Sequence, residues 1–146
     1  MHTIEIGGVA GSQSGKPVIV TTSWDDGDAR DLRVVEALVE RQLCGTFYCP
    51  VKPYNDKPAV TKADMREMVS QGLEVGAHGI SHEIMTETPA ERLDGIVSGC
   101  KAYLEDALGG AVPMFCYPRG RYTRQAVQAL RRAGYEGART IRMFAT

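Results

Sequence analysis

The sequence lacks the features that mark exported, membrane-spanning and nucleic-acid-binding chains. Its N-terminus has neither the basic stretch nor the apolar run of a secretory signal, and no window approaches the roughly 18 apolar residues of a membrane span. The 17 basic and 18 acidic residues give a formal net charge of −1, which leaves no basic field for nucleic acid or an anionic membrane. We therefore expect a cytoplasmic chain whose partner is a carbohydrate or another small molecule, with no nucleic-acid or membrane partner.

Cysteine is sparse, and its spacing excludes common metal and redox motifs. The four cysteines stand at positions 44, 49, 100 and 116, so no Cys-x-x-Cys pair exists for a zinc ribbon or a thiol oxidoreductase. Cys44 and Cys49 fall in a run expected to be extended, which would place them roughly 17 Å apart, beyond the reach of a disulfide. We expect free thiols.

The length of 146 residues allows one domain with one main core. Hydrophobic residues make up 43% of the chain, which excludes disorder as its general state. Internal repeats and low-complexity tracts are absent, and glycine and serine are concentrated only between residues 7 and 15. We expect residues 1–16 to form a flexible lead-in and residues 17–146 to form a single domain.

Apolar runs and helical spacings alternate along this domain. Short β-branched or apolar runs predict strands over residues 17–24, 45–49, 73–77, 112–117 and 135–140. The segments between them place apolar residues at helical spacing, as at Leu32, Val35 and Leu38. This order predicts an α/β fold of parallel βαβ units with the helices outside, as an open sheet or a barrel.

Several helix starts carry capping signals. Asp28 or Asp31 is expected to cap the first helix, and Thr61 with Asp64 resembles a capping box at the second. The segment Thr88-Pro89-Ala90-Glu91 predicts a threonine cap with proline at the first helical position of the third helix.

Three polar clusters each follow a predicted strand and precede a predicted helix. They are Asp25-Asp26-Gly27-Asp28, His78-Gly79-Ile80-Ser81-His82 and Tyr117-Pro118-Arg119-Gly120. An isolated acidic turn is usually only a helix cap. In parallel α/β folds, however, sites are built at the carboxyl ends of the strands, so three clusters there indicate a site.

Two histidines and a carboxylate in these clusters suit a metal ion. His78 and His82 are four residues apart, and adjacent Asp25 and Asp26 leave a strand on different sides, so one can bind a metal while its neighbour acts otherwise. Such a set suits zinc and leaves coordination positions open. Calcium is disfavoured, because Arg30 follows the acidic run and no glutamate ends a twelve-residue loop in register.

Two other side chains could have either a structural or a functional role. Trp24 can be a core aromatic, which we prefer, or a platform in a sugar site. Cys116 can be a nucleophile, but a buried apolar role is favoured.

The motifs resemble those of a known family. Residues 22–27, Thr-Ser-Trp-Asp-Asp-Gly, are similar to the Thr-Phe-Asp-Asp-Gly motif of polysaccharide deacetylases, and residues 78–82 resemble that family's His-Ser/Thr-x-x-His motif. Residues 45–48 stand in the place of its Ala-Thr-Phe-Phe strand. The resemblance covers Val18 to about Thr140 and is to carbohydrate esterase family four, the nodulation-type chitooligosaccharide deacetylase domain.

The resemblance implies a fold and a role for each motif residue. The fold is a partial or irregular (β/α) barrel. Asp26, His78 and His82 are implied to hold a divalent metal, best matched by Zn²⁺, with Asp25 as the general base. The turn at Pro118-Arg119-Gly120 resembles the family's oxyanion turn and makes the backbone N–H of Arg119 the oxyanion donor.

Three departures from the family pattern stand out. Gly79 replaces a small hydroxyl residue, so a hydrogen bond that holds the histidine loop is missing or comes from Ser81. Cys116 replaces the arginine that orients the base, for which Arg119 or Arg121 could substitute. The family's acid histidine has no counterpart, and His2 is the one histidine outside the motif.

A full (β/α) barrel needs about 250 residues, so the chain is expected to be truncated at its C-terminus relative to the family, with sheet edges that a second copy could cover. The expected function is a metal-dependent hydrolase that removes N-acetyl groups from an amino-sugar polymer or oligosaccharide. The alternatives are a non-catalytic metal- or carbohydrate-binding domain, or a metal-dependent hydrolase of another ester or non-peptide C–N bond.

Overall fold

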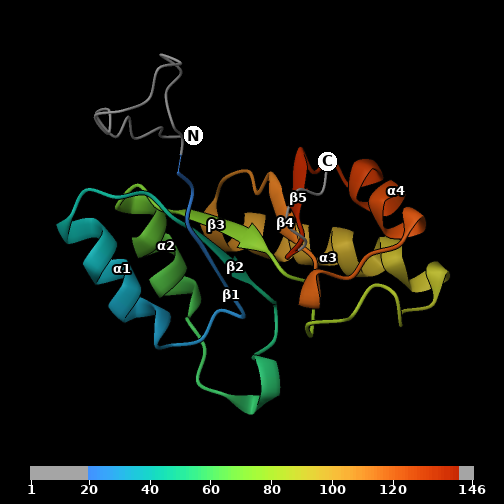
Figure 1. The fold of residues 1–146 in the computed structure, drawn as a ribbon, viewed down its shortest axis with the longest axis horizontal. Coiled ribbons are helices and arrows are strands. Elements are labelled where there is room, and N and C mark those ends of the chain that lie inside the picture. The colour runs from blue at the N-terminus through green and yellow to red at the C-terminus, as the bar shows by residue number, and fades with distance from the viewer. Residues whose placement is uncertain (1–19, 142–146) are drawn as a thin grey trace, which may run out of the picture.

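The computed structural model describes residues 20–141, so the expected lead-in over residues 1–16 lies outside it. Within that range, short strands alternate with helices in the order that the sequence predicts (Figure 1). The elements are β1 (Ser23–Asp25), α1 (Asp31–Glu40), β2 (Thr46–Cys49), η1 (Tyr54–Asp56), α2 (Lys62–Ser70), β3 (Glu74–Ala77), α3 (Ala90–Leu108), β4 (Met114–Cys116), η2 (Pro118–Gly120), α4 (Arg124–Arg132) and β5 (Gly137–Arg139).

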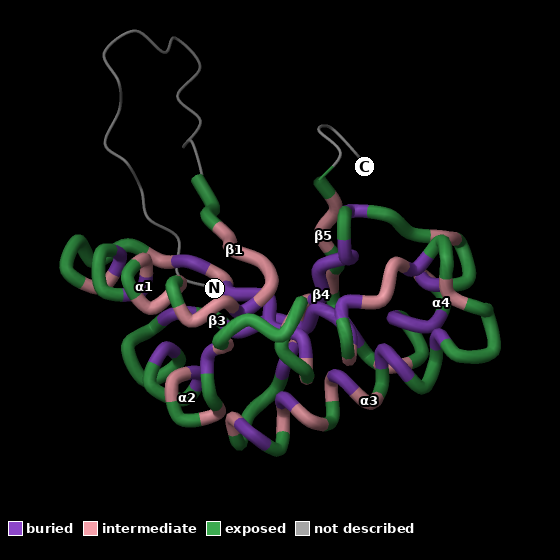
Figure 2. The backbone as a smooth tube through the Cα atoms, turned by 90° about the horizontal axis from the view of Figure 1, so that it is seen from below, coloured by how far each residue is buried: buried purple, intermediate pink, exposed green. Residues whose placement is uncertain are grey.

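The five strands of the described region form one parallel sheet in the order β1-β2-β3-β4-β5. Right-handed crossovers between successive neighbours place every helix on the same side, and the sheet curls away from them. Figure 2 shows the helices as an arc around the strands, open on the side where β1 and β5 face each other. The fold is therefore a curled half-barrel, which confirms the predicted α/β class.

The edge strands are shorter than the sequence predicts. Residues 17–19 of the expected first strand lie outside the described region, and Val20 is 55% exposed and unpaired, so β1 begins only at Ser23. Its ladder with β2 runs from Ser23 against Thr46 to Asp25 against Tyr48. An edge strand pairs with one neighbour only, so β1 cannot extend beyond the residues that β2 offers for pairing, and β2 has four residues.

The main core lies between the convex face of the sheet and the helices. Phe47, Val75 and Phe115 point into it from three neighbouring strands. Trp24 stacks on Phe47 with ring centroids 5.2 Å apart, so its preferred role as a core aromatic is confirmed. The four cysteines are free, as their spacing predicts. Among the described helices, none is both long and apolar enough to cross a bilayer.

One predicted cap is present and another is wrong. The Thr61 hydroxyl accepts from the Asp64 N–H at 3.2 Å, and the Asp64 carboxylate accepts from the Thr61 N–H at 2.7 Å. Thr88 does not cap α3, because Pro89 occupies the N-cap position without a side-chain cap, and the Thr88 hydroxyl instead donates to the Ile84 carbonyl at 2.9 Å. The Thr88 side chain therefore stabilises the preceding turn and not the start of α3.

The expected aspartate cap of α1 is also absent. Arg30 stands at the N-cap position, with no side-chain cap. The Asp28 carboxylate accepts from the backbone N–H and the guanidinium of Arg30, at 2.7–2.9 Å, and is thereby held in its own turn. Asp31 is the first helical residue, where its charge still meets the positive end of the helix dipole.

Candidate metal and catalytic site

The parallel sheet brings the acidic cluster and the histidine cluster together at the carboxyl ends of its strands. Asp26 follows β1, and His78 and His82 follow β3. Asp26 Oδ1 lies 3.4 Å from His78 Nε2 and 3.3 Å from His82 Nε2. These are the three residues assigned to the metal from the sequence, and their ligand atoms all lie within 4.8 Å of one another.

The site loops contain residues in the left-handed backbone region. Asp26 has φ 76°, His82 has φ 61° and Arg119 has φ 53°. L-residues rarely adopt this region, and such conformations persist where the surrounding structure enforces them, often at functional sites. At Gly27, which has φ 60°, an added Cβ would lie 3.2 Å from Cys49 Sγ. The turn after β1 is thus fixed tightly against β2.

Glu83 holds the histidine loop, not Ser81. Its Oε2 accepts hydrogen bonds at 2.9 Å from the backbone N–H groups of Ile80 and Ser81. Gly79 has φ 84°, and an added Cβ there would lie 2.8 Å from the same oxygen. Glycine at position 79 therefore makes room for the Glu83 carboxylate. Of the two expectations for this loop, a missing bond or one from Ser81, the described residues show no bond from the Ser81 side chain, and Glu83 ties the loop instead.

His78 is held in the tautomer that binds metals. Its side chain is buried, and its Nδ1 lies 2.8 Å from the carbonyl oxygen of Cys116. A carbonyl oxygen only accepts, so Nδ1 carries the proton and the lone pair of Nε2 faces Asp26. Burial lowers the pKa of His78, and burial together with the His78 charge lowers the pKa of His82. Both rings are therefore favoured in the neutral form.

The three side chains fit a divalent cation by their donor chemistry. The Nε2 lone pair of His78 and Asp26 Oδ1 are both acceptors, and at 3.4 Å they repel unless a cation or a proton lies between them. In a tetrahedral zinc site, bonds of about 2.0–2.2 Å place neighbouring ligand atoms roughly 3.3–3.5 Å apart. The observed separations of 3.3 and 3.4 Å match this spacing.

Asp25 lies beside these ligands and has its own partners. Its Oδ1 accepts from the guanidinium of Arg139, and its Oδ2 lies 3.5 Å from Cys116 Sγ. Burial and the Asp25 charge raise the pKa of Cys116 to about 12, so the thiol stays protonated and the disfavoured nucleophile role finds no support.

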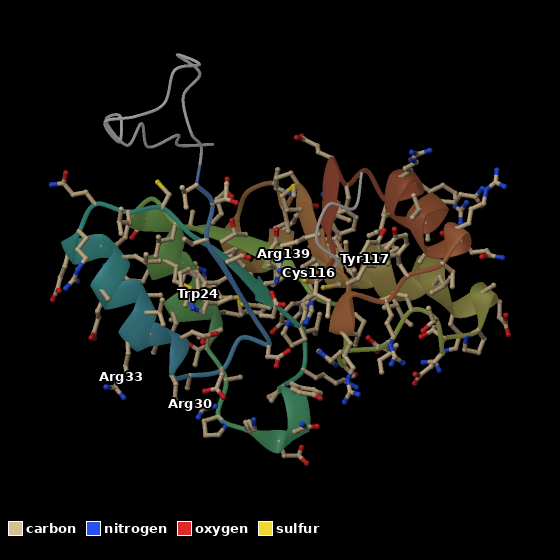
Figure 3. All side chains as sticks on the ribbon, in the orientation of Figure 1. Trp24, Arg30, Arg33, Cys116, Tyr117 and Arg139 are labelled. Atoms are coloured by element: carbon tan, nitrogen blue, oxygen red, sulfur yellow. The ribbon has the colours of Figure 1, made fainter. Side chains whose placement is uncertain are left out.

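The arginine that contacts Asp25 is not one of the two expected from the sequence. The guanidinium of Arg121 pairs with Glu87 at 3.1 Å, and that of Arg119 hydrogen-bonds Tyr54 and lowers the pKa of its hydroxyl. Arg139, which lies beside Cys116 (Figure 3) and is its register partner between β4 and β5, donates to Asp25 instead. Arg139 ends β5, at the same edge of the sheet as the other site residues, but this position alone does not identify Asp25 as its partner.

Tyr54 also borders the site without a sequence signal. Its ring centroid lies 4.0 Å from that of His82, so the tyrosine covers one face of the imidazole. It sits in a 3₁₀ turn after β2, where no periodicity marks a functional position. A cavity of about 220 Å³ opens next to Asp26 and is lined by Val51, Lys62 and Tyr103 among others.

Comparison with known proteins identifies the family. The family model for polysaccharide deacetylase matches residues 11–138. The chain belongs to the polysaccharide deacetylase family. The family resemblance drawn from the two motifs is thereby confirmed.

Three solved structures share the fold at 17–22% sequence identity. Deacetylase PplD of Streptococcus pyogenes, in complex with acetate, is 20% identical with a TM-score of 0.75, over 80% of this chain and 53% of PplD. IcaB of Ammonifex degensii is 22% identical with a TM-score of 0.76, over 84% of this chain and 60% of IcaB. BA3943 of Bacillus anthracis, described as a CE4 family pseudoenzyme, is 17% identical with a TM-score of 0.70, over 81% and 41%. The chain spans about half the length of these relatives.

Proposed function

We propose that the chain carries the metal site and the general base of a hydrolase that removes N-acetyl groups from an amino-sugar polymer or oligosaccharide. The observation that carries this proposal is the convergence of one Asp26 carboxylate oxygen and the Nε2 atoms of His78 and His82, beside the separate carboxylate of Asp25. Membership of the deacetylase family supports the same reaction class.

The chain's own residues divide the work. Asp26, His78 and His82 would hold the ion, and a bound Zn²⁺ supplies a Lewis acid and lowers the pKa of water. Asp25, one residue from the ligand Asp26, takes the proton of the attacking water. The backbone N–H of Arg119 stabilises the oxyanion, and no acceptor for it exists among the described residues.

The leaving group decides how much acid catalysis the reaction needs. Hydrolysis adds one water to the amide and yields acetate and a free amine, whose nitrogen must gain a proton. Outside His78 and His82 the described residues contain no histidine that could give it. This observation favours, as a second candidate reaction, hydrolysis of an acetyl ester, whose leaving alcohol needs less assistance.

A non-catalytic metal- or carbohydrate-binding domain is the other candidate. It is supported by the relatives, since BA3943 has this fold and is described as a pseudoenzyme.

Acetate release by the zinc-loaded protein separates these candidates. We expect turnover of N-acetylated chitooligosaccharides, and a loss of at least about 100-fold in Asp25→Asn with bound zinc unchanged. Asp94→Asn is the matched control, because that carboxylate pairs with Arg132 on the surface. Turnover of acetyl esters alone favours the esterase, whereas zinc and sugar binding without any acetate release favours the binding domain.

A further inference from the structure

The contact between Asp25 and Arg139 joins strands at the opposite edges of the sheet. Asp25 ends β1 and Arg139 ends β5, which are separated by the three other strands and by 114 positions in the chain. The guanidinium reaches across the concave side of the curled sheet to do so. Only the curl of the half-barrel brings these two side chains together.

The concave side of the sheet holds the arginine in place. The Arg139 guanidinium lies over the ring of Tyr48 at 5.4 Å, and Tyr48 is the register partner of both Asp25 on β1 and Gly76 on β3. Cys116, which contacts the other oxygen of Asp25, is in turn the register partner of Arg139. Four strands thus contribute side chains around the Asp25 carboxylate, and β3 contributes Gly76, which leaves room for the Tyr48 ring.

The geometry is not that of a pair optimised for stability. Arg139 donates to Asp25 through a single amino group, and its Nε is buried with no hydrogen-bond partner among the described residues. The surface pair of Arg132 and Asp94, by contrast, uses both Nε and Nη2 of the arginine. A buried donor without a partner is unfavourable. The arginine therefore keeps its hydrogen bond to one Asp25 oxygen at the expense of a hydrogen bond from its own Nε.

We propose that Arg139 is the positioning residue of Asp25: it fixes the rotation of the carboxylate, so that Oδ1 is taken by the guanidinium and Oδ2, which the Cys116 thiol contacts only weakly at 3.5 Å, receives the proton of the attacking water. The proposal rests on the proposed function, in which Asp25 is the base. Asp25 and Arg139 are 30% and 32% exposed, so their attraction is screened by water and contributes little to folding.

The test compares steady-state acetate release by zinc-loaded variants. In Arg139→Met we expect kcat to fall about 10- to 100-fold, with KM and zinc content unchanged and a melting temperature within about 4 °C of the wild type. Arg132→Met, which removes a surface arginine with a carboxylate partner, should leave kcat unchanged. If Arg139→Met does not fold, Arg139→Lys keeps the charge without the planar fork, and we expect its kcat to fall about tenfold.

A second test places an arginine on the neighbouring strand, at position 116, in a protein that lacks Arg139. Recovery of kcat in this double variant is expected for a positioning role and not for a purely structural one. Cys116 Sγ lies 3.5 Å from Asp25 Oδ2, so an arginine at position 116 can reach the same carboxylate once Arg139 is shortened. We expect Cys116→Arg with Arg139→Ala to recover at least about tenfold in kcat over Arg139→Ala alone. Wild-type kcat in Arg139→Met, or a double variant as slow as the single one, would overturn the positioning role alone. No turnover by the zinc-loaded wild type would overturn the proposed function and this role with it.

Discussion

The ring of Tyr48 occupies the space that a side chain at Gly76 would fill. An added Cβ at Gly76 would lie 2.5 Å from two carbons of the Tyr48 ring, closer than real Cβ contacts come. The Arg139 guanidinium lies over the same ring. Gly76 on β3 therefore lets the Tyr48 ring lie close to the sheet, which leaves space above the ring for the guanidinium that contacts Asp25.

Gly76→Ala is therefore expected to destabilise the protein by about 1–3 kcal/mol through overpacking. Chemical denaturation measures the change in free energy of unfolding. Gly95→Ala is the matched control, because an added Cβ at Gly95 in α3 meets no atom within 4 Å and the substitution should stabilise the helix by up to about 1 kcal/mol. Equal effects at both positions would contradict the packing described for Tyr48.

Metal affinity should fall when the pH drops below the normal range of histidine titration. The pKa values of His78 and His82 are lowered from 6.5, so both rings are neutral at pH 7 and bind metal without first losing a proton. Zinc affinity measured by calorimetry should stay constant from pH 8 to about 6.5 and weaken only below it. A steep loss of affinity already between pH 8 and 7 would mean that the rings are protonated near neutrality.

Asp31 should make the metal-free protein less stable as pH rises. Burial, followed by the charge of Asp28, raises the pKa of Asp31 from 3.8 to about 6. A folded-state pKa above the unfolded value favours folding below pH 3.8, and this contribution is lost as pH rises to about 6. Asp31→Asn should therefore raise the free energy of unfolding at pH 7 by about 1–2 kcal/mol after allowance for solvent screening, and by little at pH 3.5. The same gain at both pH values would exclude titration of Asp31 as the cause.

The backbone at position 119, not its side chain, should matter for turnover. Arg119 has φ 53° and an exposed guanidinium near Tyr54. Arg119→Asn and Arg119→Val both remove the guanidinium, but asparagine tolerates the left-handed region and a β-branched valine does not. We expect acetate release close to that of the wild type in Arg119→Asn and at least about tenfold slower release in Arg119→Val, with zinc content equal in both. Equally slow release in both variants would assign the role to the side chain.

The sequence predicts those parts of the site that depend on local order along the chain. Asp26, His78 and His82 each follow a strand, and parallel strands bring such positions to one edge whatever the details of packing. Arg139 was missed because its partner is set by the curl of the whole sheet, which brings β5 opposite β1. The predicted cap at Thr88 is wrong because its hydroxyl donates to the Ile84 carbonyl in the preceding turn, whereas the Thr61 hydroxyl donates to Asp64 in the first turn of the helix that it caps.

The central claim is a single metal ion held by Asp26, His78 and His82. The most direct measurement is a crystal structure of the zinc-loaded protein with anomalous scattering recorded at the zinc edge. We predict one strong peak about 2.0–2.2 Å from Asp26 Oδ1 and from the Nε2 atoms of His78 and His82, with Asp25 outside the coordination sphere. A peak held by other side chains, or none under saturating zinc, would contradict the account.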